Sequence, residues 1–139
     1  MSAQRFRRCT IAVTQPNVTK PKDIDLARQF AIEAARLAAN TRCSEVVVLD
    51  VSAISPVTDF LLLATGTSAR QMQSVCQEIE EVGQPLGFKA LNQSGLEGES
   101  WMVQDFFQVV VHLFGHEARA YYDLDGLWGD AKKVEWKQG

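Results

Sequence analysis

Short apolar runs that alternate with longer segments of helical periodicity most constrain what this chain can fold into. Strand-length apolar runs are Glu45–Val51, Phe60–Thr65 and Val109–Phe114, and the first, which is β-branched, apolar and bounded by polar residues, is expected to be a buried strand. Shorter strand-like runs are Phe88–Asn92 and Trp101–Asp105. Helical segments are expected over Asp23–Thr41, Ser68–Leu86 and His116–Trp128. This order predicts a mixed β-sheet covered by helices, in the α/β or α+β class.

The chain has the size of one ordinary domain, which we place at residues 23–131. Its 139 residues contain no apolar run near the roughly 20 residues that a membrane-spanning helix needs, so we expect a cytoplasmic protein without a membrane partner. Residues 1–22 are predicted to form a flexible basic arm, with a short organellar transit peptide as the alternative. Residues 132–139 are expected to form a polar tail.

The net charge of −3 conceals an uneven distribution. Residues 1–22 carry five basic residues and no acid, whereas the other 117 residues carry 9 bases and 17 acids. Nucleic-acid phosphates are bound by Lys and Arg, so the domain itself is not suited to bind them, and contact of the arm with RNA stays open. An acidic surface suits a basic protein partner, because opposite fields speed encounter and favour the correct register.

The residues predict neither a metal site nor a cofactor. Cys9, Cys43 and Cys76 lie more than 30 residues apart, which offers neither close ligand spacing nor a disulfide framework. His112 falls on an expected strand and His116 begins an expected helix, so the two do not share a helical face as the familiar zinc spacing requires. A hydrogen-bonded structural role is the favoured interpretation of His112.

The segment Gly66-Thr67-Ser68 joins an expected strand to an expected helix, where backbone amides can bind a phosphate. It lacks the lysine of a P-loop and the glycine fingerprint of dinucleotide-binding folds. Nucleotidyltransferases also open their site with a Gly-Ser turn, but they hold Mg²⁺ with carboxylates on the next strand, and Phe88–Asn92 contains none. We therefore expect no enzyme, and a residual nucleotidyltransferase using Ser68 remains the rival interpretation.

Aromatic residues set among acids lie near the expected hairpin of Trp101–Asp105 and Val109–Phe114. Rigid aromatic side chains are frequent energetic centres of protein interfaces, so this group indicates a binding protein. For Trp101 and Phe106 the choice between an interface position and a core position stays open. Phe106 and Phe107 are neighbours in the turn, where two adjacent aromatic side chains are not easily both buried.

Several stretches within about residues 24–131 form a characteristic series, and the basic arm lies outside them. They are Val48-Leu49-Asp50-Val51, Thr58-Asp59-Phe60, Ala64 through Gln71, Gly95 through Trp101, Val109 through Phe114, then Glu117, Arg119, Tyr121-Tyr122-Asp123-Leu124 and Leu127-Trp128. Taken in this order along the chain, they resemble the ribosomal silencing factor S (Iojap) family. The resemblance implies a nucleotidyltransferase-like fold without its catalysis, which agrees with the missing carboxylates on the strand Phe88–Asn92.

The resemblance also implies a function and a partner. The family binds the large ribosomal subunit through ribosomal protein fourteen, on the face that meets the small subunit, and thereby blocks subunit joining and lowers translation. By resemblance, the partner-binding residues are Trp101, Asp105, Phe106, Gln108 and His112. A large-subunit assembly or maturation factor that uses the same surface is the main alternative, and the free protein could form a homodimer through that surface.

The hairpin turn departs from the family pattern. Family members usually have a Gly-Asp pair where this chain has Phe107 and Gln108. Glycine is the residue best suited to a positive φ, and the missing aspartate is an acid that could face the partner. The departure therefore concerns the geometry of the turn and the contribution of position 108 to binding.

Overall fold

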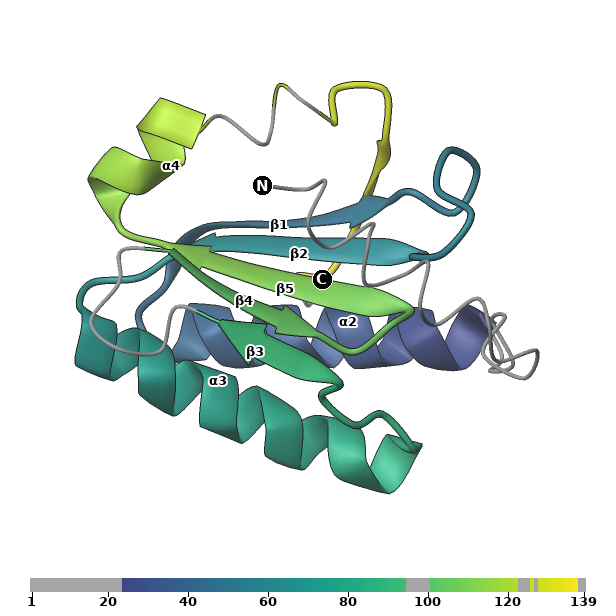
Figure 1. Cartoon of the computed structure of the whole chain (residues 1–139), viewed down its shortest axis with the longest axis horizontal. Coiled ribbons are helices and arrows are strands. Elements are labelled where there is room, and N and C mark those ends of the chain that lie inside the picture. The colour runs from purple at the N-terminus through teal and green to yellow at the C-terminus, as the bar shows by residue number, and fades with distance from the viewer. Residues whose placement is uncertain (1–23, 95–100, 123–125, 127, 138–139) are drawn as a thin grey trace.

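The computed structural model describes residues 24–94, 101–122, 126 and 128–137, so the expected arm at residues 1–22 lies outside the described part. Within it, six strands form one sheet in the order β3-β4-β5-β2-β1-β6 (Figure 1). The strands are β1 (Ser44–Asp50), β2 (Phe60–Thr65), β3 (Asn92–Ser94), β4 (Trp101–Asp105), β5 (Val109–Phe114) and β6 (Lys132–Val134). The helices are α2 (Ile24–Asn40), α3 (Ala69–Gly83) and α4 (His116–Tyr122), and η2 (Gln84–Leu86) is a 3₁₀ turn.

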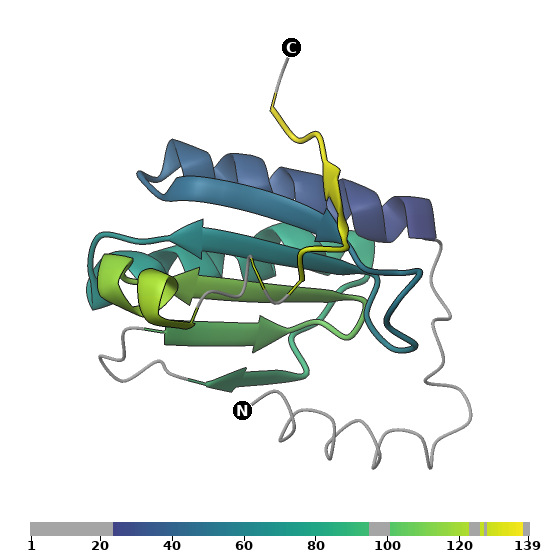
Figure 2. The same cartoon turned by 90° about the horizontal axis from the view of Figure 1, so that it is seen from above.

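The predicted mixed sheet packed against helices is confirmed. β2 and β5 pair in parallel at the centre, and the other neighbouring strands are antiparallel. Every residue of β2 and β5 is buried, because α2 and α3 cover one face of the sheet while α4 and the segment 128–131 pack over the other. Figure 2 shows α4 over the face turned away from α3. Burial on both faces explains why these two strands are continuously apolar instead of alternating.

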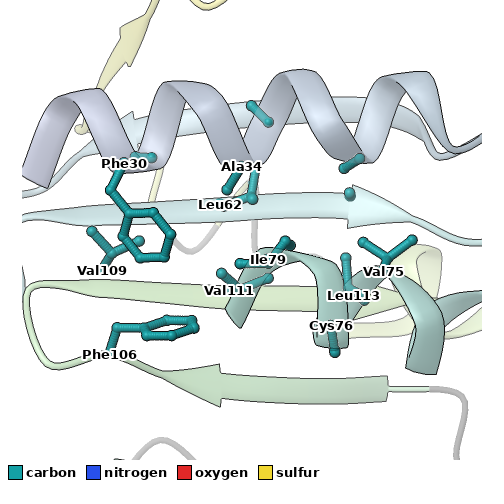
Figure 3. Packing of buried hydrophobic residues seen from close by; sticks show 14 of the residues in the cluster. Phe30, Ala34, Leu62, Val75, Cys76, Ile79, Phe106, Val109, Val111 and Leu113 are labelled. Atoms are coloured by element: carbon teal, nitrogen blue, oxygen red, sulfur yellow. The ribbon is translucent and has the colours of Figure 1, made fainter. Parts of the chain in front are cut away.

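The layer between the sheet and the two long helices holds the main core (Figure 3). The buried stripe of α2 consists of Phe30 and five alanines, and such small side chains let a helix lie close to a sheet. The stripe of α3 includes Val75, Cys76 and Ile79, as its helical spacing predicts. Leu62 of β2 and Val111 of β5 meet these helices from the sheet.

The start of α3 is fixed by the predicted capping residues. The Ser68 hydroxyl accepts a hydrogen bond from the backbone amide of Gln71 at 3.1 Å, which satisfies one of the free donors of the first turn. In a standard capping box the Gln71 side chain would accept from the amide of Ser68 itself. Here its Oε1 accepts from the amide of the preceding residue, Thr67, at 3.1 Å.

The end of α3 differs from the sequence-based expectation. The α-helix ends at Gly83 and continues as η2, which Gly87 ends with φ 88 and an amide that donates to the Gln84 carbonyl at 3.0 Å. Phe88 then turns inward and stacks on Phe30 with ring centroids 4.9 Å apart. The strand expected over Phe88–Asn92 therefore begins later, as β3, because Phe88 is used for core packing.

The segment expected as a polar tail contributes an edge strand. β6 pairs antiparallel with β1, with Val134 opposite Val48. Just beyond it, the Trp136 indole donates to the Val46 carbonyl at 3.1 Å, and the Trp136 carbonyl accepts from Arg36 of α2 at 2.7 Å. These contacts attach residues 132–136 to the sheet and to α2.

The outer face carries a second apolar cluster beneath α4. Its buried members come mainly from β1, β2 and β5, and Trp101 and Trp128 pack against its rim. Arg119 holds α4 in place, because its guanidinium donates to the Glu45 carbonyl at 2.9 Å and to the Thr65 hydroxyl at 3.0 Å. The same guanidinium carbon lies 5.9 Å from the centre of the Phe114 ring.

Candidate partner-binding hairpin

The β4–β5 hairpin carries all five residues predicted to bind a partner. Its register places Trp101 opposite Phe114, Val103 opposite His112 and Asp105 opposite Val110. Side chains directly opposite each other across an antiparallel pair share a face. Because Phe114 and Val110 belong to the outer cluster, Trp101, His112 and Asp105 lie on the outer face of the sheet.

Phe106 lies on the opposite, inner side of the hairpin. Its ring meets Phe30 edge-on at a centroid distance of 4.9 Å, and Phe30 stacks in turn on Phe88. With 3% of its surface exposed, Phe106 belongs to the main core (Figure 3). Of the two alternatives left open for this residue, the structure places it in the core.

The turn itself is built around an unusual backbone conformation. Phe107 has φ 77, the left-handed region in which bulky L-residues are uncommon. Asp105 supports it, because its Oδ1 accepts from the Phe107 amide at 2.8 Å, and the Gln108 amide donates to the Phe106 carbonyl at 3.0 Å. The position at which the family resemblance implies glycine thus does require a positive φ, and here an aromatic residue adopts it.

The turn is also attached to the loop that precedes β2. The Gln108 carbonyl accepts from the amides of Asp59 and Phe60, both at 2.9 Å, and the Gln108 side-chain amide donates to Asp59 Oδ2 at 2.9 Å. The Thr58 hydroxyl donates to the Phe107 carbonyl at 3.2 Å. Asp59 and Gln108 are each about 1% exposed, so this network is internal and Gln108 acts on the turn from inside. Thr58 and Asp59 were among the residues that carry the resemblance, but no local pattern indicated that they hold the turn.

Trp101 is the one predicted binding residue that is partly exposed. Its indole stacks on Phe114 at a centroid distance of 5.3 Å, and its Nε1 donates to His112 Nδ1 at 3.2 Å. His112 is 3% exposed, which agrees with the expected hydrogen-bonded structural role. Asp105 is 5% exposed. Of these residues, Trp101 is therefore the one whose side chain is open to contact from outside, while Asp105, Gln108 and His112 lie beneath the surface.

The hydroxyl of Ser68, considered above for a nucleotidyltransferase, and the thiols of Cys43 and Cys76 have structural positions. Ser68 caps α3 with its hydroxyl. Burial raises the pKa of Cys76 to about 12 and also raises that of Cys43, which lowers the fraction of each thiol present as the nucleophilic thiolate. In the described part of the chain, no group of three His, Cys, Asp or Glu side chains is arranged to hold a metal ion. No helix of that part is long and apolar enough to cross a membrane.

Comparison with known proteins identifies the family. The family model described as "Ribosomal silencing factor during starvation" matches residues 24–138. The chain belongs to this ribosomal silencing factor family. Two similar proteins are named ribosomal silencing factor RsfS. The one from Halalkalibacterium halodurans is 38% identical over 74% of this chain and 92% of the relative. The one from Bacillus subtilis is 35% identical over 70% of this chain and 83% of the relative. The chloroplastic protein Iojap of Arabidopsis thaliana is 29% identical over 76% of this chain and 44% of that protein.

Solved structures agree with this assignment to the silencing-factor family. A Chromobacterium violaceum protein superimposes with a TM-score of 0.68 at 27% identity, covering 85% of this chain and 95% of the other. A Bacillus halodurans protein gives a TM-score of 0.64 at 34% identity, covering 81% and 99%. The family matches from the first residue of α2 to beyond β6, so the edge strand that sequence periodicity missed lies inside the matched region.

Proposed function

We propose that this silencing factor binds the large ribosomal subunit through ribosomal protein fourteen and prevents the small subunit from joining it. In this proposal the protein acts in the cytoplasm as a non-enzymatic repressor. Its effect depends on occupancy, because a subunit that carries the factor on its joining face cannot dock its partner subunit at the same time.

The observation that carries the proposal is the state of Trp101. Its indole is half-buried and fixed by a stacking contact with Phe114 and a hydrogen bond to His112, so little side-chain freedom is lost when a partner covers it. Half-buried tryptophans of this kind are common energetic centres of interfaces. The acidic balance of residues 23–139 supports a basic ribosomal protein as the partner.

Sedimentation of purified subunits tests the proposal. Large and small subunits are mixed with increasing amounts of the full chain and separated on a sucrose gradient. The protein should migrate with the large subunit, and the peak of joined ribosomes should fall as its concentration rises. Binding without loss of joining would favour the assembly-factor alternative, and failure to migrate with the large subunit would reject the ribosome as partner.

Two matched tryptophan variants separate binding from folding. Trp101→Ala should weaken binding to the large subunit about tenfold or more, in line with the roughly 1–3 kcal/mol that interface anchors contribute. Trp136→Ala is the control, because Trp136 is also half-buried and donates an indole hydrogen bond, but beside β1 and α2. If both variants remain folded and Trp101→Ala binds as tightly as Trp136→Ala, the assigned role of Trp101 is wrong.

A further inference from the structure

Exposed apolar side chains of the described residues gather at one end of the sheet. β1 and β4 end there and β2 and β5 begin there, since Asp50 pairs with Phe60, Phe60 with Val109 and Asp105 with Val110. This is the right-hand end in Figure 1, where the β4–β5 turn lies. Among the described residues, the large hydrophobic side chains with the greatest exposure are Leu91 at 60%, Ile54 at 51% and Ile24 at 39%. Each belongs to a loop or helix start at this end.

Two of these loops are joined to the hairpin by hydrogen bonds at its turn. The Leu91 amide donates to the Asp105 carbonyl at 2.7 Å, which places Leu91 beside the end of β4. The Thr58 hydroxyl donates to the Phe107 carbonyl at 3.2 Å, which places the loop between β1 and β2 on the other side of the turn. We use the term turn end for the surface formed by Leu91, Phe107 and Ile54.

Phe107 is the strained residue of the turn end. Its φ of 77 is unfavourable for a bulky residue, and it persists because the Asp105 carboxylate and the Thr58 hydroxyl hold the peptide groups on either side. Phe106 occupies the core position next to it, and Phe107 is outside the main core and partly exposed. Strain maintained by surrounding contacts is characteristic of functional positions.

We propose that Phe107 is a partner-contact residue, which extends the docking surface of Trp101 around the hairpin turn to Leu91 and Ile54. The inference rests on the proposed function, because its occupant is the same protein of the large subunit. Trp101 and Asp105 are the two ends of β4, about 13 Å apart at strand spacing. An interface of ordinary size buries about 800 Å² on each partner, a patch about 30 Å across, so one partner can cover both Trp101 and the turn end.

Two substitutions at position 107 separate the ring from the backbone. Phe107→Gly removes the ring and accepts the positive φ, whereas Phe107→Ala removes the ring and keeps the strained conformation. The glycine variant should therefore melt a few degrees higher than the alanine variant. Both should bind large subunits about tenfold more weakly than the wild type, and Phe107→Tyr should restore most of the affinity.

The measurement is the dissociation constant of the full-length wild type and each variant for purified large subunits, with the melting temperature measured alongside. Leu91→Ser and Ile54→Ser should each weaken binding several-fold. The proposal is overturned if the glycine and alanine variants bind within twofold of the wild type, or if affinity follows melting temperature and not the ring. It is also overturned if these variants leave binding to the large subunit unchanged and alter only self-association of the free protein, because the turn end would then bind a second copy of this chain. Absence of binding by the wild type would instead reject the proposed function itself.

Discussion

Replacing Gly83 with alanine tests whether the aromatic cluster behind the hairpin is as rigid as its packing implies. A Cβ built on Gly83 lies 2.8 Å from Cζ and 2.9 Å from Cε1 of Phe30, and 3.2 Å from the carbonyl oxygen of Phe88. Ordinary contacts between such atoms are about 3.5–4.0 Å. The added methyl group therefore fits only if the ring or the backbone moves.

The surroundings of Phe30 set the size of the penalty. Its ring is fully buried between Phe88 and Phe106, with both centroid distances at 4.9 Å, so it has no space into which to move. Overpacking of this kind costs about 1–3 kcal/mol. Alanine is a better helix former than glycine by up to about 1 kcal/mol, and the gain is smaller at Gly83, the last residue of α3. The net expectation is a loss of about 1–2 kcal/mol in the free energy of unfolding.

Urea denaturation followed by circular dichroism measures this loss. Ser74→Ala on the exposed side of α3 is the control for helix propensity and should change stability by less than about 0.5 kcal/mol. In a Phe30→Leu background the smaller side chain should relieve the contact, so the penalty of Gly83→Ala should shrink. Equal or greater stability of Gly83→Ala, or an undiminished penalty beside leucine, would refute the packing argument.

Other contacts lead to further predictions. Arg119→Met should lower the free energy of unfolding by about 2–3 kcal/mol, because two hydrogen bonds from the guanidinium to β1 and β2 are lost. It should also speed amide hydrogen exchange in α4, and an unchanged exchange rate would contradict this role of Arg119. Iodoacetamide at pH 8 should leave Cys43 and Cys76 unmodified in the native protein and react with both in denaturant, as mass spectrometry would report, since burial raises both pKa values. Burial raises the pKa of Asp50, but hydrogen bonds from Ser52 and nearby positive charges outweigh it, so the net pKa lies below the ordinary 3.8. The ionised Asp50 carboxylate therefore stabilises the fold at pH values above its pKa in the unfolded chain, and this effect is lost as the pH falls through its lower pKa in the folded protein. Ser52→Ala should cost about 1 kcal/mol of stability at pH 7 and progressively less toward pH 2, as stability measurements across this range would report.

The central strands could be predicted because their sequences carry the signal themselves. β2 and β5 are buried on both faces and read as continuous apolar runs with the bounds that the sequence indicated. The start of α3 was predictable for a similar reason, since the capping contacts of Ser68 and Gln71 involve neighbours in the chain.

The edge strands could not be predicted in the same way. β6 is formed by Lys132, Lys133 and Val134, a sequence with no apolar alternation, and its pairing depends on β1 more than 80 residues earlier. β3 begins at Asn92 and not at Phe88, because the partners that draw Phe88 inward, Phe30 above all, are distant in sequence. Such contacts with distant segments leave no local pattern.

The two neighbouring phenylalanines show why the candidate site was also harder to read than the fold. The sequence indicates that Phe106 and Phe107 are not easily both buried, but nothing local says which one turns inward. The cluster of Phe30 and Phe88 decides it, because it offers Phe106 an enclosed aromatic contact. Replacing Phe106 with alanine would open a cavity and cost about 3–5 kcal/mol, so a loss of binding in that variant would not separate a lost contact from lost stability. Trp101 and Phe107, which are partly exposed, are therefore better suited than Phe106 to substitutions that test the proposed partner recognition.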